Sequence, residues 1–174
     1  MGARAAVTTI AAAAVLAGCG GEDQPPSAPE TMRFSSPAFA DGAAIPRAFS
    51  CDGAGRAPAL AWSGVPRAAA ELVLFVDDTD AGYVHWTAYA IPAASTGAPG
   101  GRLPAGAKQG RNSAGKDGWT PPCPPRGDDP HHYVFSLYAL KRRTWLAAGA
   151  DPGDVRSALE GAAARGTFTG TYRR

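Results

Sequence analysis

The segment "WTPPCPPRGDDPHHYVFSLYAL", Trp119–Leu140, joins a proline-rich loop directly to an apolar strand. Prolines have a fixed φ and no backbone N–H group, so a loop with five of them between Pro121 and Pro130 keeps its shape without a ligand. From His132 onward, large apolar side chains occupy both alternating sets of positions, as in a strand that has packed layers on both faces. The segment therefore predicts an interior strand whose entrance is held by a stiff loop.

Other runs of the chain also indicate β structure. The continuous apolar run Glu71–Asp78 predicts a second buried strand, and the alternating run Val84–Pro92 predicts a third. Shorter strand signals lie at Pro58–Pro66 and Thr167–Arg174. We therefore expect a mainly β protein with antiparallel strands.

Helix is expected only late in the chain. Between Asp151 and Arg165, Pro152 suits the first helical position, Asp151 can act as the cap, and apolar residues share one face. Residues 95–118 are rich in Gly, Ala and Pro and predict a long loop. The expected fold class is thus mainly β with one or two short helices.

The N-terminus predicts export. Residues 1–18 have the order of a signal peptide, with Arg4 before an apolar run and a small-residue cleavage site. The sequence "LAGC", which ends at Cys19, resembles a bacterial lipobox, and this resemblance implies that Cys19 becomes the lipidated N-terminus; the alternative is a plain secretory signal. Residues 19–31 are Gly, Pro and charged residues that predict a flexible tether, and 32–174 form the folded domain. The expected location is the bacterial cell envelope, lipid-anchored outside the cytoplasm.

Charge and cysteine usage restrict the partners further. The formal net charge is only +2 and no basic block stands out, which disfavours a nucleic-acid partner. Cys51 and Cys123 remain once Cys19 is assigned to the lipid. In an oxidising compartment this pair predicts a disulfide, although two free buried thiols are an alternative. Neither belongs to a Cys-x-x-Cys unit, which disfavours a metal site.

Three clusters of polar residues could form a site. The acidic run Asp77–Asp80 ends a buried strand, His85 and Trp86 open the next one, and His131 and Tyr133 follow the proline loop. On a regular strand His85 and Trp86 point to opposite faces, whereas His131 and Tyr133 share a face that excludes His132. Taken singly, each cluster is as well explained by a solvated turn or a structural histidine.

Taken together, the motifs resemble the phosphatidylethanolamine-binding protein family, and within it the bacterial Raf-kinase-inhibitor-like branch. They are "CDGAGRAPALAWSGVP", "VDDTDAGYVHW", "GRNSAGKDGWTPPCPPRGDDPHHYVFSLYAL" and the terminal "GTYRR". The resemblance implies an antiparallel β-sandwich with a small pocket for phosphate-like or carboxylate-like anions, including phospholipid headgroups. The pocket residues that it implies are Asp78, Asp80, His85, Cys123, Pro124, His131 and Tyr133. It implies neither a cofactor nor a metal.

The sequence also departs from the family pattern near this pocket. Thr79 replaces the usual proline, and Pro121 replaces the glycine that usually precedes "PCPP". If these residues share one pocket, as the resemblance implies, we expect the neighbouring carboxylates to favour the charged forms of both His85 and His131. Charged imidazoles would then bind oxyanions through charge-assisted hydrogen bonds, more strongly at mildly acidic pH.

Two classes of function follow from these expectations. The first is a binding protein for a small anionic ligand or phospholipid headgroup, which could also regulate or inhibit a protein partner or form a homodimer. The alternative is a metal-assisted hydrolase that uses Asp78, Asp80, His85 and His131. The chain has no GxSxG nucleophile motif, which favours the first class. A third reading is that the pocket is vestigial and the protein acts through its surface.

Overall fold

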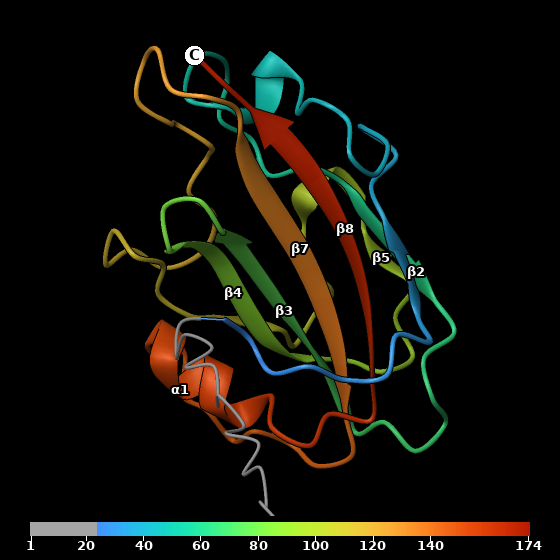
Figure 1. Cartoon of the computed structure of the whole chain (residues 1–174). Coiled ribbons are helices and arrows are strands. Elements are labelled where there is room, and N and C mark those ends of the chain that lie inside the picture. Colours follow the sequence, from blue (N-terminus) through green and yellow to red (C-terminus); the bar gives the residue numbers. More distant parts are fainter. Residues whose placement is uncertain (1–23) are drawn as a thin grey trace, which may run out of the picture.

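The computed structural model of the chain describes residues 24–174 (Figure 1). The predicted signal peptide 1–18, the predicted lipidation site Cys19 and residues 20–23 lie outside the described residues. Two antiparallel sheets form the body of the protein. The larger sheet has the strand order β6-β4-β3-β7-β8, and the smaller has the order β1-β2-β5.

The bounds of the elements agree with most of the sequence-based expectations. The larger sheet consists of β3 (Glu71–Asp78), β4 (Tyr83–Ile91), β6 (Lys108–Gln109), β7 (His131–Leu140) and β8 (Ala164–Tyr172). The smaller sheet consists of β1 (Arg33–Ser35), β2 (Leu60–Ser63) and β5 (Gly97–Ala98). One α-helix, α1 (Pro152–Ala158), and two 3-10 turns, Arg47–Phe49 and Pro99–Gly101, complete the part of the chain that the structure describes.

The strand β3 is the centre of the larger sheet, paired with β4 on one side and β7 on the other. All eight of its residues are buried. Leu74 faces the smaller sheet, whereas Phe75 faces the outer layer. A strand with apolar side chains on both faces needs a packed layer on each side, and this requirement produces the three-layer arrangement.

The core between the two sheets is rich in aromatic rings. Phe135 of β7 stacks on Phe168 of β8 with their ring centroids 4.7 Å apart. Phe34 of β1 packs edge-on against Phe168 at 5.0 Å and against Trp62 of β2 at 6.2 Å. Each fully buried side chain of this size contributes about 2 kcal/mol of transfer free energy, so these rings hold the small sheet on the large one.

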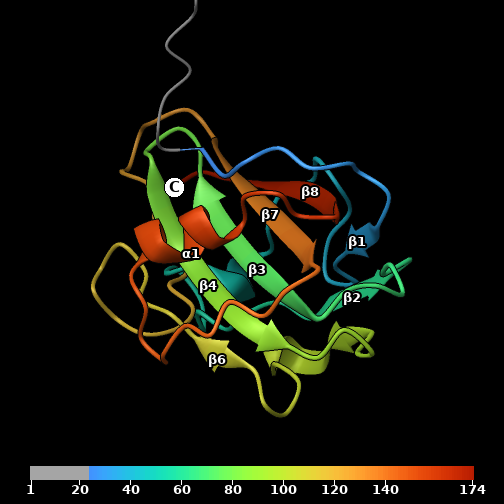
Figure 2. The same ribbon diagram turned by 90° about the horizontal axis from the view of Figure 1, so that it is seen from below.

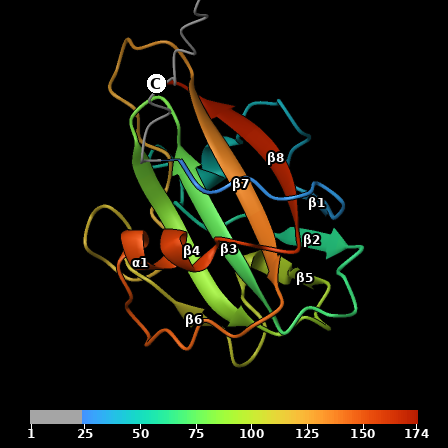
Figure 3. The same cartoon turned by 60° about the horizontal axis from the view of Figure 1, so that its bottom comes forward.

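The outer face of the larger sheet is covered by α1 and by the N-terminal segment (Figures 2 and 3). Val155 of α1 is buried against the sheet. The Tyr138 hydroxyl donates a hydrogen bond to the Pro26 carbonyl at 3.0 Å, and the Arg165 backbone N–H donates to the Pro29 carbonyl at 2.8 Å. Residues 26–31, which were predicted to belong to a flexible tether, therefore lie against the sheet instead.

Three details of the expectations are tested by the structure. The helix ends at Ala158, earlier than predicted, because Gly161 adopts a positive φ of 70° and the chain then enters β8. Asp151 makes no side-chain cap; its carboxylate instead lies 3.3 Å from Arg111. The disulfide between Cys51 and Cys123 is formed. In residues 24–174, none of the helices has the length and apolar character needed to cross a membrane.

Candidate ligand-binding pocket

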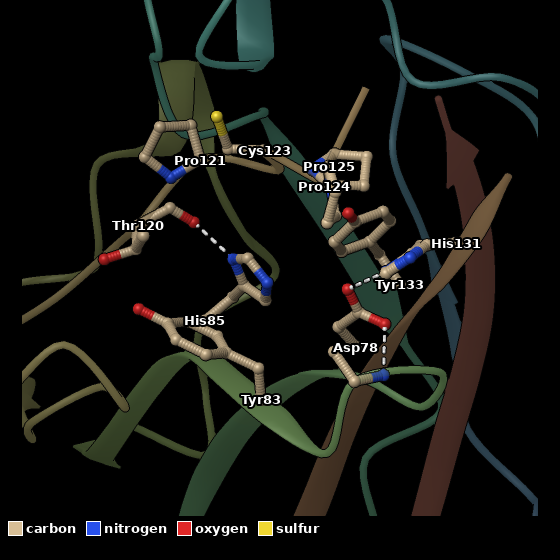
Figure 4. Close-up of a pocket in the computed structure, with 11 residues that line it drawn as sticks. Asp78, Tyr83, His85, Thr120, Pro121, Cys123, Pro124, Pro125, His131 and Tyr133 are labelled. Atoms are coloured by element: carbon tan, nitrogen blue, oxygen red, sulfur yellow. Dashed lines mark hydrogen bonds and ion pairs between the residues drawn. The ribbon is translucent and has the colours of Figure 1, made fainter. Parts of the chain in front are cut away.

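A pocket of about 220 Å³ opens at the end of the larger sheet where β3 ends and β7 begins (Figure 4). The proline loop closes its other side. Six of the seven residues expected from the sequence line it. The full lining consists of Asp78, Ala81, Tyr83, His85, Thr120, Pro121, Cys123, Pro124, Pro125, His131 and Tyr133.

His85 reaches the pocket because β4 carries a β-bulge. Val76 pairs with Trp86 while the next residue, Asp77, pairs with Val84, so His85 is an extra residue in the ladder. As a result His85 and Trp86 lie on the same side, and both rings pack against Trp119, at 6.3 and 5.8 Å. The expectation that they face opposite ways is wrong, since it assumed a regular strand.

Asp78 is the fixed acidic group of the pocket. One of its oxygens, Oδ1, accepts hydrogen bonds from the backbone N–H groups of Asp80 and Ala81, at 3.0 and 3.1 Å. The other, Oδ2, lies 2.7 Å from Nδ1 of His131, which donates to it. Only 4% of the side chain is exposed. The carboxylate is therefore held from three directions, and its role is to orient His131.

His131 is the charged donor of the pocket. The hydrogen bond to Asp78 raises the pKa of His131 above its ordinary value, and the nearby negative charges act in the same direction. Its Nε2 lies 3.7 Å from a carboxylate oxygen of Asp128, a half-exposed residue at the rim. The imidazolium therefore persists to higher pH than in a free histidine, with Nε2–H available to a ligand that displaces the Asp128 side chain.

His85 behaves differently from the expectation. Its Nδ1 lies 2.7 Å from the Thr120 carbonyl oxygen, so Nδ1 carries the proton and donates it there. Burial lowers the pKa of His85, and this effect outweighs the hydrogen bond and the charge of Asp78. The prediction that carboxylates keep both histidines charged is thus wrong for His85, which is a neutral ring with Nε2 as an acceptor.

Tyr133 supplies a second donor. Its side chain is fully buried, and its hydroxyl lies near the Asp78 carboxylate without forming a hydrogen bond of normal geometry to any described residue. Burial, together with the negative charge of Asp78, raises the pKa of Tyr133. The hydroxyl therefore stays protonated. A buried hydroxyl without a partner is costly, and in a pocket it is a group that a ligand can satisfy.

The wall made by the proline loop is braced from the outside. Cys123 is bonded to Cys51, and the Cys51 backbone N–H donates to the Pro122 carbonyl at 3.0 Å. The neighbouring Asp52 accepts hydrogen bonds from Arg174 at 3.1–3.2 Å. The hydrogen bond from Arg174 is the main reason why the pKa of Asp52 is lowered. These contacts fix the loop whether or not the pocket is filled.

Asp80 is the one expected site residue that does not line the pocket. Its carboxylate accepts the backbone N–H of His132 at 2.6 Å and lies 3.0 Å from the His132 ring. The backbone hydrogen bond is the main cause of its lowered pKa. This pair is on the exposed side, since the strand alternation that turns His131 inward turns His132 outward.

Five lining residues are absent from the set expected from the sequence: Ala81, Tyr83, Thr120, Pro121 and Pro125. Tyr83 stands two positions before His85, a spacing that places both on one face of a strand. Thr120 contributes through its backbone carbonyl, for which the side chain gives no signal. In residues 24–174, no group of three or more His, Cys, Asp or Glu side chains is arranged to hold a metal ion.

Comparison with known proteins places this chain in a family. The family model described as "Phosphatidylethanolamine-binding protein" matches residues 35–173. The Mycobacterium tuberculosis protein named "Putative lipoprotein LppC" is 40% identical over 190 residues, which cover 96% of this chain and 94% of the relative. A Methanothermobacter thermautotrophicus protein of the UPF0098 group is 41% identical over 152 residues, covering 82% of this chain and 99% of the relative.

Solved structures agree with this assignment. Two crystal structures, those of CT736 from Chlamydia trachomatis and YbcL from Escherichia coli, each superpose with a TM-score of 0.76, at 35% and 32% identity. Both alignments cover 83% of this chain and 99% of the solved chain. The sandwich, the order of its motifs and the sequence identity lead to one conclusion: this chain belongs to the phosphatidylethanolamine-binding protein family.

Proposed function

We propose that the protein is a lipid-anchored binding protein of the bacterial cell envelope that takes a small anionic group in this pocket. The group would be a phosphate, a carboxylate or the headgroup of a phospholipid. The lipidation motif at Cys19 and the name of the mycobacterial relative support the anchor and the location. The anionic ligand is supported by the donors that converge in the pocket.

One observation carries the proposal: the buried Tyr133 hydroxyl has no well-formed hydrogen bond in a preformed cavity that also contains His131, whose pKa is raised by the hydrogen bond to Asp78. An oxyanion can accept hydrogen bonds from both. Asp78 does not oppose this strongly, because its charge is matched by His131 and its two oxygens already accept three hydrogen bonds. The site therefore offers donors to a ligand and few free acceptors.

The alternative of a metal-assisted hydrolase has less support from the geometry. Both oxygens of Asp78 are already occupied, and Asp80 lies outside the pocket beside His132. His85 donates Nδ1–H to a carbonyl, which leaves only its Nε2 for a ligand. The four residues that the hydrolase hypothesis requires are thus not presented together to a common point.

Calorimetric titration with inorganic phosphate, acetate and phosphoethanolamine tests the proposal and separates a free anion from a headgroup. In the Tyr133→Phe variant, loss of one hydrogen bond to a charged group should weaken binding about tenfold. Tyr138→Phe is the matched control, because Tyr138 belongs to the same strand but its hydroxyl lies on the outer face. Affinity in the wild type should fall as the pH rises through the raised pKa of His131.

Two results would contradict the proposal. Equal affinities of wild type and Tyr133→Phe for all three probes would show that the pocket hydroxyl binds none of them. Stoichiometric zinc that purifies with the wild type and is lost in His85→Ala would favour the hydrolase instead.

A further inference from the structure

The loop that follows β7, residues 141–146, presents a tryptophan to solvent. Trp145 is 81% exposed and is the only exposed large apolar side chain in residues 24–174. Its φ is 56°, in the left-handed region that bulky residues rarely adopt. Such a conformation costs on the order of 1–3 kcal/mol and persists only when surrounding contacts enforce it.

Buried and charged groups from other strands enforce this conformation. Glu71, which is buried at the start of β3, accepts the Thr144 backbone N–H at 2.9 Å. Lys108 of β6 donates from Nζ to the Leu146 carbonyl at 2.8 Å. The Trp145 side chain is therefore held outward from both sides of the loop, although nothing in the described residues covers it.

The same loop concentrates positive charge. Lys141, Arg142 and Arg143 are consecutive and exposed, and none of them forms an ion pair with another described residue. The guanidinium of Arg143 lies 5.7 Å from the centre of the Trp145 ring. Glu160 is the one acidic residue that lines the adjoining groove with these cations. The whole chain has a net charge of only +2, so the loop is a local exception.

Loop 141–146 lies close enough to the predicted lipid anchor for both to contact one membrane surface. Gln24 lines a cavity together with Val134, Ser136 and Tyr138 of β7, and β7 rises about 3.3 Å per residue. Gln24 is therefore about 7–20 Å along the strand from its end at Leu140. The five residue steps from Gln24 back to Cys19 span at most about 17 Å. The anchor, which is part of the proposed function, and loop 141–146 can thus meet one surface.

We propose that loop 141–146 docks on an anionic membrane surface, with Trp145 at the level of the lipid headgroups. Tryptophan is favoured at membrane interfaces because it combines an apolar ring with a polar N–H group. Lys and Arg next to a membrane anchor are attracted by anionic lipids. The pocket then stands at the far end of β7, about 30 Å from the docked loop.

Fluorescence of the lipid-anchored full chain in vesicles tests this proposal. Trp145 is the only one of the four tryptophans that is exposed, so brominated lipids should quench its emission selectively when the loop docks. We expect quenching in phosphatidylcholine vesicles that contain phosphatidylglycerol, and its loss in vesicles of phosphatidylcholine alone or at high salt. Trp145→Phe identifies the signal, because it should remove the quenched component.

Charge variants supply the decisive comparison. Each cation near an anionic surface changes the ratio of docked to undocked loop about fivefold, so Lys141→Gln with Arg142→Gln and Arg143→Gln should lower it on the order of 100-fold. The matched control removes three exposed cations elsewhere, Arg67→Gln, Arg102→Gln and Lys116→Gln, and should quench like the wild type. Near-ultraviolet circular dichroism checks that both variants are folded, and Arg142→Gln alone serves if the triple variant is not.

Equal quenching in neutral and anionic vesicles, or equal quenching of the two triple variants, would overturn the proposal. So would protection of Trp145 by a soluble acidic protein or nucleic acid but not by vesicles. Failure of the loop to dock is distinguishable from failure of the proposed function. If the lipid anchor were absent, the chain would not float with neutral vesicles at all. Anion titration tests the pocket separately from both the anchor and the loop.

Discussion

Replacing Asp78 by asparagine should destabilise the protein by about 2 kcal/mol at mildly acidic pH, because it removes a hydrogen bond between charged groups. The Asp78 carboxylate accepts from His131 through one oxygen and from two backbone N–H groups through the other. An asparagine amide has one acceptor oxygen and one donor nitrogen. In either orientation, at least one of these donors faces an N–H group instead of an acceptor.

The size of this effect should depend on pH in a defined direction. The folded-state pKa of His131 is raised, mainly by the hydrogen bond to Asp78. The stability that this shift contributes is fully present below the unfolded pKa of about 6.5 and is lost as the pH rises through the folded pKa. The difference in unfolding free energy between wild type and Asp78→Asn should therefore be largest near pH 6 and smaller in alkaline solution.

Urea unfolding of the two proteins at about pH 6 and about pH 9 measures this difference. Asp80→Asn is the matched control, since Asp80 forms the corresponding pair with His132 on the exposed side, where such pairs contribute less than about 1 kcal/mol. In a domain of this size, 2 kcal/mol corresponds to a melting temperature about 6 °C lower. The reasoning would be refuted if Asp78→Asn lowered the unfolding free energy no more than Asp80→Asn does. It would also be refuted if the loss in Asp78→Asn did not change with pH.

Three further experiments test other parts of the structure. Burial raises the pKa of Asp77 to about 6. The stability that the protonated carboxyl provides is therefore present below about pH 4 and is lost as the pH rises through 6. Asp77→Asn cannot ionise, so it should raise the free energy of unfolding by roughly 2–3 kcal/mol at neutral pH, measured by thermal unfolding. The disulfide joins residues 72 apart, and a reductant should lower the unfolding free energy by about 4 kcal/mol while leaving Cys51→Ala/Cys123→Ala unaffected. Gly166→Ala should destabilise the protein, because the added Cβ would lie 2.7 Å from a backbone oxygen. Gly153→Ala in α1 places its Cβ in open space, and calorimetry should show the protein stabilised by about 0.5 kcal/mol.

The long strands could be predicted because the order of apolar and polar side chains along them matches the pattern of burial. β3 was expected at its observed bounds, and β7 within one residue of them, since both are apolar on each face. The two-residue strands β5 and β6 could not be predicted, because two residues show no periodicity. Their positions depend on partners in β2 and β4, which are distant in sequence.

The pocket could be predicted as a set of residues but not as a set of protonation states. The alternation of β7 was enough to put His131 inward and His132 outward. The bulge at His85 could not be foreseen, because it arises from the register between β3 and β4 and leaves no mark on the local sequence. The contact between His85 and the Thr120 carbonyl follows from that bulge, and it is why the charge of this histidine differs from the expectation.

The cross-link between Cys51 and Cys123 has a consequence for when the protein becomes competent. Cys123 lies in the pocket wall, so one wall is tied to the domain by a bond that forms only under oxidising conditions. If the protein is exported as proposed, its precursor in the reducing cytoplasm lacks this disulfide and has a less constrained pocket wall. Abundant cytoplasmic phosphates and carboxylates would then meet an immature cavity, and the site would be completed only at its destination.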